Sequence, residues 1–582
     1  MGYDYALVHL KFNIPPAIFL TFLYRPLLTR LNAYKIIFLI VIAVVATTPW
    51  DSYLIHSHIW SYPLNAIIGP TLFRIPAEEI FFFVIQTYNT SLLYLILSQP
   101  TFHSIFLRGK SRDLYLQKWL GQAIISVGII LGWLMVIVGG EGFYLGLILV
   151  WAGPFVLLLW SLAYQFILGL PLTNTALPIA LPTLYLWVVD TLALKRGTWV
   201  IESGTKLGWH LWDGLEIEEA IFFLATNVLI VFGQIAFDNA LAVLYTFPHL
   251  FPTTSTLPSP VTKIRALLIP ASLYDDARIK GMHSALVRLK SKSRSFYIAS
   301  SVFPGRLRID LVLLYSFCRV ADDLVDTSVT VAEARAWITR LEKYLDILYG
   351  SKNTSSARDN FVKATFPIST QASLLLLPTS YLSPKPLYDL LKGFEMDLEF
   401  SSEKGRFLIK DESELQLYAA RVAGTVAELC IELVYHHTLV IPARSVRQRV
   451  VQAGGRMGIA LQYVNIARDI AVDAHIGRVY LPTTWLQEYD LQPSDVIKDP
   501  ESAKVESLRQ KLLDKAMNNY SEARGAIEEL PPEARGPMRV AVESYMEIGR
   551  TLRQSQYKMK AGRATVPKLR RLQVAWTALG RP

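Results

Sequence analysis

The sequence predicts an all-α protein in two parts, a membrane-embedded bundle of seven helices followed by a second helical domain. Its 582 residues exceed what one compact domain usually holds. Hydrophobic residues make up 52% of the chain and charged residues only 18%, whereas soluble domains carry about 25% charged residues. The charges are also unevenly distributed, because long uncharged stretches end near Phe237 and charged residues become frequent after Lys263.

Uncharged runs locate the seven membrane helices. The run from Gly142 to Val189 has 48 residues without Asp, Glu, Lys or Arg. Since one span needs about 20 residues, this run holds two helices, divided near Gly169. The other helices are expected near residues 5–24, 34–50, 80–100, 118–139 and 218–237.

Basic residues in the loops predict the orientation of these helices. Arg25, Arg30 and Lys35 lie between the first two helices, and the segment between the third and fourth is basic as well. Basic loops stay on the cytoplasmic side of a membrane. The N-terminus is therefore expected outside, and the chain after the seventh helix is expected in the cytoplasm.

The membrane half contains an internal repeat. Residues of about 5–100 resemble those of 143–237, with the fourth helix between them. The equivalent acids, offset by 139 or 140 positions, are Asp51 and Asp190, Glu78 and Glu218, and Glu79 and Glu219. A shift of four spans preserves direction, so the repeats are parallel. All six carboxylates are then expected near one membrane face.

These six acids are candidates for proton transfer. A carboxyl group in a low-dielectric site stays protonated near neutral pH and can act as a general acid, while a second carboxylate accepts a proton. Protonating an alkene makes a cation, a neighbouring double bond attacks it, and proton loss leaves a ring, with no redox cofactor. A lone Glu pair at a helix start more often complements the helix dipole, but two matching copies favour a catalytic site.

The N-terminal half resembles the fungal lycopene cyclase domain and its bacterial and archaeal heterodimeric relatives, over about residues 1–240. Those proteins carry Pro-x-Glu-Glu in each of two homologous halves. The first copy, Pro76–Glu79, fits, while the second has Glu216 where proline is expected. The resemblance implies cyclisation of the linear ends of lycopene to β-rings, with no cofactor. No Gly-x-Gly-x-x-Gly follows a strand, so the chain does not resemble the flavin-binding cyclases.

Residues 241–280 are predicted to be a linker, because Pro, Ser and Thr dominate 251–260. From 281 to 582, apolar residues recur at intervals of three and four, which predicts an all-α domain. The two cysteines, Cys318 and Cys430, exclude a disulfide scaffold and a cysteine-rich metal site.

Two helices of the second domain carry acid motifs in which polar residues share one face at spacings of three and four. The residues are Tyr315, Arg319, Asp322 and Asp326 in the first motif, and Gln462, Asn465, Asp469 and Asp473 in the second. Acids stacked on one helix face repel each other. Mg²⁺ would remove that cost, because it binds carboxylate oxygens and keeps phosphate oxygens among its other ligands. Two such helices facing each other therefore predict a site for a metal-bound diphosphate.

The second domain resembles the squalene/phytoene synthase family and its isoprenoid-synthase fold, over about residues 280–570. Gly393–Asp397, Tyr418–Val426 and Asp473–Pro482 are similar to segments of that family. The resemblance implies head-to-head condensation of two geranylgeranyl diphosphates to phytoene through prephytoene diphosphate, with Mg²⁺ or Mn²⁺. It assigns the metal to Asp322, Asp323, Asp326, Asp469 and Asp473, diphosphate to Lys292, Arg294, Arg319 and Arg468, and the site lining to Tyr315, Tyr418, Gln462 and Asn465.

Together the two halves resemble the fused fungal lycopene cyclase/phytoene synthases of carotenoid biosynthesis. The expected partners are geranylgeranyl diphosphate, lycopene or related acyclic carotenes, the lipid bilayer and a carotene desaturase. Nucleic acid is not expected despite the net charge of +10. Two alternatives remain open: a membrane-anchored squalene-synthase-like prenyltransferase, which Gly477–Pro482 disfavours, and an N-terminal half that is a passive anchor or a transporter.

Overall fold

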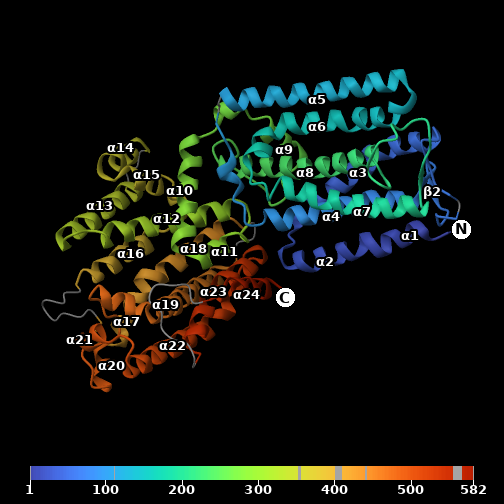
Figure 1. Ribbon diagram of the computed structural model, residues 1–582. Helices are drawn as coiled ribbons and strands as arrows, with labels where there is room; N and C mark the ends of the chain where they lie inside the picture. The colour runs from blue at the N-terminus through green and yellow to red at the C-terminus, as the bar shows by residue number, and fades with distance from the viewer. Residues whose placement is uncertain are drawn as a thin grey trace. The chain divides into compact units, whose positions relative to one another are not determined.

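The computed structural model describes residues 2–63, 65–109, 112–350, 355–399, 409–438, 442–554 and 566–580. Within these ranges the protein is all-α apart from three short two-stranded ladders, which confirms the predicted fold class. The chain forms two compact units, Met1–Ile279 and Lys280–Pro582 (Figure 1).

The N-terminal unit holds seven helices that are long and apolar enough to cross a membrane, counted over the described residues. Some of these spans combine several helical elements. The elements are α1 (Asp4–Val8), η1 (His9–Asn13), α2 (Ile14–Tyr24), η2 (Arg25–Leu27), α3 (Arg30–His56), α4 (Ala77–Ser98), η3 (His103–Phe106), α5 (Arg112–Val138), η4 (Gly140–Gly142), α6 (Phe143–Gly169), α7 (Ala176–Arg196), α8 (Ile217–Thr246), α9 (Pro260–Leu267) and η5 (Ala271–Leu273).

The first span stays helical through Pro15 and Pro16. Both prolines lie where the π-helical turn η1 passes into α2, so the regular hydrogen-bond pattern already changes at this point. The π-helical turn η1 directly precedes them and joins α1 to α2. The first span therefore continues from Asp4 to Leu27.

Two hairpins of the N-terminal unit occupy equivalent places in the two repeats. β2 (Thr71–Leu72) pairs with β3 (Ile75–Pro76) just before α4, and β5 (His210–Trp212) pairs with β6 (Leu215–Glu216) just before α8. A third ladder joins the repeats, because β1 (Trp60–Ser61) runs antiparallel to β4 (Val200–Ile201).

The helices that carry the Glu pairs, α4 and α8, form the centre of the bundle. In each, 56% of the most apolar window is buried, against 6% in α5. The helices α3, α6 and α7 surround this pair, and α5 packs on α6 alongside them (Figure 1). The repeat thus places its two acid helices in contact at the middle of the unit.

The C-terminal unit is a set of helices around one long central helix, α19. The elements are α10 (Asp276–Lys292), which begins in the preceding unit, α11 (Arg294–Ser300), α12 (Gly305–Asp326), α13 (Val331–Tyr349), α14 (Ser355–Thr365), α15 (Ile368–Leu375), η6 (Thr379–Tyr381), α16 (Pro384–Asp397), α17 (Glu412–Ala419), η7 (Ala420–Gly424), α18 (Thr425–His436), α19 (Arg444–His475), α20 (Thr483–Glu488), α21 (Pro493–Lys498), α22 (Ala503–Ala523), η8 (Arg524–Glu529), α23 (Pro532–Leu552) and α24 (Lys568–Leu579).

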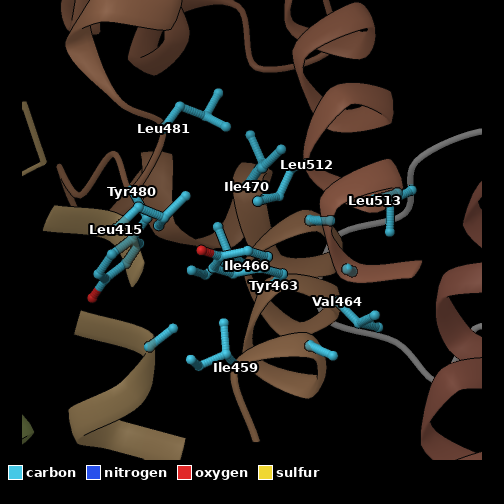
Figure 2. Packing of buried hydrophobic residues seen from close by; sticks show 14 of the residues in the cluster. Leu415, Ile459, Tyr463, Val464, Ile466, Ile470, Tyr480, Leu481, Leu512 and Leu513 are labelled. Atoms are coloured by element: carbon cyan, nitrogen blue, oxygen red, sulfur yellow. The ribbon is translucent and has the colours of Figure 1, made fainter. Parts of the chain in front are cut away.

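The apolar face of α19 builds the core of this unit. Ile459, Tyr463, Ile466 and Ile470 recur at intervals of three and four and are buried with residues of α17 and α22 (Figure 2). Burying such side chains contributes about 1.5–3 kcal/mol each before entropy is subtracted. The neighbouring face of the same helix carries the second acid motif, and Ile466 belongs to both the core and the cavity lining, so packing of the core also orients the acids.

A close approach of two backbones fixes η7 against α19. A Cβ atom on Gly458 would lie 2.5 Å from the carbonyl oxygen of Ala423 and 2.7 Å from Cα of Gly424. Both obstacles belong to the backbone and cannot rotate away. Only glycine therefore fits at position 458.

We expect Gly458→Ala to lower the free energy of unfolding of the C-terminal unit by about 1–3 kcal/mol, because the added methyl group forces η7 and α19 apart. Thermal unfolding of the detergent-solubilised full chain measures this effect. Gly525→Ala is the matched control, since a Cβ atom there meets nothing within 4 Å. Equal losses in the two variants would contradict the explanation.

Two candidate active sites

The six acids of the repeat are all buried in the N-terminal unit. Asp51 and Asp190 lie within the last two turns of α3 and α7, and the Glu pairs lie in the first turns of α4 and α8. Their exposed fractions do not exceed 5%. Glu79 lies within electrostatic range of Asp51 and of Glu219. The structure thus brings carboxyl groups of both repeats to one end of the bundle.

The second glutamate of each pair is held by a tyrosine hydroxyl. Tyr5 donates a hydrogen bond to Glu79, and Tyr144 donates one of 2.6 Å to Glu219. Tyr62 donates a further bond of 2.9 Å to Glu79. Tyr5 and Tyr144 are 139 positions apart, so the repeat duplicates the hydrogen bond together with the acid. Sequence reasoning missed both tyrosines, although their shared offset was a usable signal.

The first glutamate of each pair binds the loop before its helix instead. The carboxylate of Glu78 accepts a 2.7 Å bond from the backbone N–H of Ile68, and that of Glu218 accepts a 2.7 Å bond from the N–H of Leu207. These bonds satisfy backbone donors that would otherwise be buried without a partner. Glu78 and Glu218 therefore support the loops, while Glu79 and Glu219 are the members with the tyrosine partners.

The two aspartates are less alike than the glutamates. Asp190 accepts a 3.1 Å bond from the indole N–H of Trp199. Neither carboxyl oxygen of Asp51 has a hydrogen-bond partner among the described residues. A buried polar group without a partner is costly and is rare outside functional sites.

Aromatic rings surround the carboxyl groups. Phe82 of α4 lies edge-on to Phe223 of α8 at 6.0 Å between ring centroids, and Trp50 stacks on Phe222 at 5.5 Å. Trp60 packs against the same cluster. Ring faces attract positive charge, so this lining suits a cationic hydrocarbon.

Glu216 stands where proline is expected in the second Pro-x-Glu-Glu motif, yet its backbone has nearly the same conformation as that of Pro76 in the first. Glu216 precedes α8 with φ −66° and ψ 146°, and Pro76 precedes α4 with φ −55° and ψ 145°. Lys206 donates a 2.7 Å bond to the Glu216 carboxylate. In the first repeat, proline itself favours this conformation. In the second repeat, Glu216 adopts the same conformation and forms an ion pair with Lys206.

The acid motifs of the C-terminal unit face a shared cavity of about 660 Å³. Asp322 and Asp326 reach it from α12, Asp469 and Asp473 from α19, and Asp397 from the end of α16. The rest of the lining is mainly apolar, and most of it comes from η7, α18, α19, η8 and α23. The cavity thus combines a carboxylate cluster with a hydrocarbon-lined interior.

Arginines pair with the carboxylates. Arg319 lies 2.9 Å from Asp322 and 2.6 Å from Asp323, and Arg478 lies 3.2 Å from Asp326. Both arginines line the cavity. Guanidinium groups bind carboxylate and diphosphate oxygens equally well, which makes these contacts exchangeable.

The predicted binding residues fall into two groups. Those that line the cavity are Tyr315, Arg319, Tyr418, Gln462 and Asn465. Lys292, Arg294, Arg468 and Asp323 are not part of its lining. Lys292 contacts Asp323 at 3.3 Å. Arg468 reaches the cavity only through two lining residues, because it donates hydrogen bonds to Asp469 at 2.7 Å and to Asn465 at 2.6 Å.

The crowded carboxylates are easier to protonate than isolated ones. Burial, reinforced by neighbouring Asp326, raises the pKa of Asp322 to about 6. Burial and Asp469 raise the pKa of Asp473 to about 7, and burial raises that of Asp397 to about 7 against the opposing effect of Arg478. A cation would relieve this repulsion.

The donor set of the cavity fits a hard divalent ion. Its acids offer carboxylate oxygens, which Mg²⁺ and Mn²⁺ prefer. Cys318 and Cys430 also line the cavity, but burial raises the pKa of both thiols, which keeps them in the neutral form that binds metals poorly. Over the described ranges, no three Asp, Glu, His or Cys side chains converge closely enough to hold an ion as they stand. The acids are paired with arginines instead, so metal binding requires these pairs to rearrange.

Sequence reasoning assigned no role to three further polar residues of the cavity. The Asp397 carboxylate accepts a 2.8 Å bond from Tyr480 and a 3.2 Å bond from Tyr418. The three residues are therefore Asp397, Tyr480 and Arg478, all of which line the cavity. They lie in segments already noted for their family resemblance, but only the folded chain shows that they meet the acid motifs.

Comparison with known proteins identifies the family of the chain. The squalene/phytoene synthase family model matches residues 289–570. The bifunctional lycopene cyclase/phytoene synthase of Leptosphaeria maculans is 62% identical over 583 residues and covers 100% of both chains. That of Pyrenophora tritici-repentis is 61% identical, again over 100% of both chains. The chain belongs to the bifunctional lycopene cyclase/phytoene synthase family.

Membership of this family confirms an enzyme of carotenoid biosynthesis with both activities. The match runs through the N-terminal half as well, so it does not support a passive anchor or a transporter there. A solved dehydrosqualene synthase is 23% identical with a TM-score of 0.42, and the match covers 51% of this chain and 95% of the other.

Substitution of Arg478 tests whether the synthase cavity binds diphosphate. We expect Arg478→Ala to reduce phytoene formation by about 100-fold, because it removes a cavity-lining positive charge that a diphosphate could use. Arg478→Lys should recover part of the activity, since it keeps the charge but loses the planar fork. Arg449→Ala, at an exposed pair with Glu529, is the control. Phytoene is measured in extracts of a bacterium that makes geranylgeranyl diphosphate, and full activity of Arg478→Ala would contradict the assignment.

Proposed function

We propose that the N-terminal unit cyclises the linear ends of lycopene to β-rings by proton transfer, and that the C-terminal unit condenses two geranylgeranyl diphosphates into phytoene. The observation that supports the first assignment is the duplicated tyrosine–glutamate contact among aromatic rings. The observation that supports the second is the cluster of acids in one largely apolar cavity.

Cyclisation needs one proton delivered and one removed. A protonated carboxyl of the Glu79 and Glu219 pair gives its proton to the terminal double bond of the carotene, which becomes a tertiary cation. A neighbouring double bond of the substrate attacks this cation and closes the ring, and a carboxylate then takes a proton from a ring carbon. The product is an isomer of the substrate, so no oxidant or reductant is consumed. Asp51 and Asp190 lie within electrostatic range of these glutamates and would influence which of them carries the proton.

Condensation begins with binding of two diphosphates beside the acid motifs. Asp322, Asp326, Asp469 and Asp473 would hold Mg²⁺ or Mn²⁺, with Asp323 adjoining. When bound, the metal neutralises the diphosphate leaving group. Arg319 and Arg478, now paired with these acids, would be placed to bind diphosphate oxygens once the acids hold the ion.

The remaining lining controls the cations that follow ionisation. Tyr315, Tyr418, Gln462 and Asn465 orient the substrates around the acids. The apolar walls hold the prenyl chains and exclude water, which would otherwise capture a carbocation. Proton loss from the rearranged cation then gives phytoene.

The N-terminal unit is proposed to span a membrane, with the synthase unit on the cytoplasmic side. Seven apolar helices and the basic loops support this arrangement. Phytoene is an insoluble hydrocarbon, so a synthase held at the bilayer can release it into lipid. A carotene desaturase must act between the two reactions, and association with one is part of the proposal.

Exchange of the central glutamates tests the cyclase assignment. Glu79→Gln and Glu219→Gln should each lower ring formation by about 10²–10⁴-fold, because glutamine cannot donate or accept the proton. Ring-bearing carotenes are measured in a lycopene-making bacterium. Glu141→Gln, an exposed position of the same unit, is the control. Retained phytoene formation would show that the variants are produced with a folded synthase unit, an unchanged melting temperature would show that the N-terminal unit folds, and unchanged ring formation would rule the two glutamates out.

Removal of metal and of its proposed ligands tests the synthase assignment. Asp322→Asn and Asp469→Asn should abolish phytoene formation, while Asp389→Asn, at an exposed ion pair with Lys385, should not. Chelation with EDTA should stop phytoene formation in membranes and leave ring formation intact, and added Mg²⁺ or Mn²⁺ should restore it. Phytoene made at full rate in EDTA would contradict the metal assignment.

A further inference from the structure

The segment predicted to be a linker contains a helix that packs on the membrane bundle. Helix α9 follows the last long span, is capped by the Ser259 side chain, which accepts a 3.2 Å bond from the N–H of Thr262, and packs along α8. Its buried residues are Lys263 and Ala266.

Helix α9 buries a charged residue and exposes apolar ones, the reverse of a helix on the surface of a soluble protein. Its lysine faces inward with 5% of its surface exposed, whereas Val261, Ile264 and Leu268 are 75%, 57% and 65% exposed. The spacing of three and then four places these three side chains on one face. A helix on the surface of a soluble protein shows the opposite pattern, with apolar residues inward and lysine outward.

The inward lysine lies in an aromatic cage. Its ammonium nitrogen is 4.2 Å from the ring centroid of Tyr34 and 4.3 Å from that of Phe237, with Phe38 at 5.9 Å. Among the described residues, this nitrogen has no hydrogen-bond acceptor. Ring faces therefore stabilise the charge in place of water or a carboxylate, and they tie α9 to α3 and α8.

Exposed apolar side chains also occur on α3 next to the cage. Ile37 and Val41, which flank the cage residue Phe38 on α3, are 59% and 54% exposed. α3 is one of the seven helices suited to cross a membrane. Lipid is the environment in which such an exposed apolar surface is stable.

We propose that α9 is embedded in the lipid bilayer, with Val261, Ile264 and Leu268 in contact with acyl chains and Lys263 held in the cage of Tyr34, Phe38 and Phe237. The proposal rests on the membrane location proposed above for the N-terminal unit. The linker then leaves the membrane after α9 and not after α8. The membrane part of the protein thus includes a short helix that does not cross it.

Depth-dependent fluorescence quenching tests this placement in the full chain. Ile264→Cys is labelled with a nitrobenzoxadiazole probe and reconstituted into phosphatidylcholine vesicles with or without dibrominated acyl chains. Val45→Cys, exposed on α3, serves as the lipid control, and Val329→Cys, exposed in the C-terminal unit, as the water control. The unsubstituted chain gives the background from Cys318 and Cys430, and phytoene and ring formation by each labelled variant verify its fold.

We expect brominated lipid to quench the probe at 264 about as strongly as at 45 and severalfold more than at 329. Quenching at 264 by aqueous iodide, and not by lipid, would overturn the proposal. Protection of 264 from both quenchers would also overturn it, because protein would then cover the face. If position 45 is not quenched by lipid either, the membrane location itself fails, which separates the two conclusions.

Discussion

Both halves of this enzyme depend on clustered carboxyl groups, which are buried in the N-terminal unit and line a largely apolar cavity in the C-terminal unit. Placing such groups in apolar surroundings is costly unless donors or opposite charges meet them. In the N-terminal unit, tyrosine hydroxyls, a tryptophan and backbone N–H groups provide the contacts. In the C-terminal unit, arginines provide them. The arrangement of the helices around each site follows from the need to supply these partners.

The two kinds of partner suit the two proposed chemistries. Neutral donors leave a carboxyl group free to gain and lose a proton, as an acid and base acting on an alkene must. Arginines offer fixed positive charge that can pass from a carboxylate to a diphosphate. The surroundings also differ: aromatic rings line the first site, and an apolar cavity adjoins the second. Each lining is apolar enough to keep water away from the carbocation of its proposed reaction.

Duplication explains much of the N-terminal site. Equivalent helices α4 and α8 meet at the centre of the bundle, where Gln86 donates a 2.8 Å hydrogen bond to Thr226, its counterpart 140 positions later. Because Gln86 and Thr226 are equivalent positions that touch, both lie next to the pseudo-twofold axis that relates the two repeats. The Glu79 and Glu219 carboxyl groups lie about two helical turns before these residues, so the duplication itself brings them together. Substitution of proline by Glu216 did not disturb this relation, because the backbone there kept its conformation.

The sequence by itself determined the helical class, the seven long apolar helices, the repeat, the two acid motifs and the family resemblance, because these depend on composition, period and spacing along the chain. It could not separate Glu78, which binds a loop, from Glu79, which faces Tyr5, since adjacent residues of one pair look alike in sequence. Nor could it place Asp397 and Arg478 beside the acid motifs, or turn Lys263 inward. Those features arise from contacts between segments distant in the chain, and only the packed tertiary structure decides them.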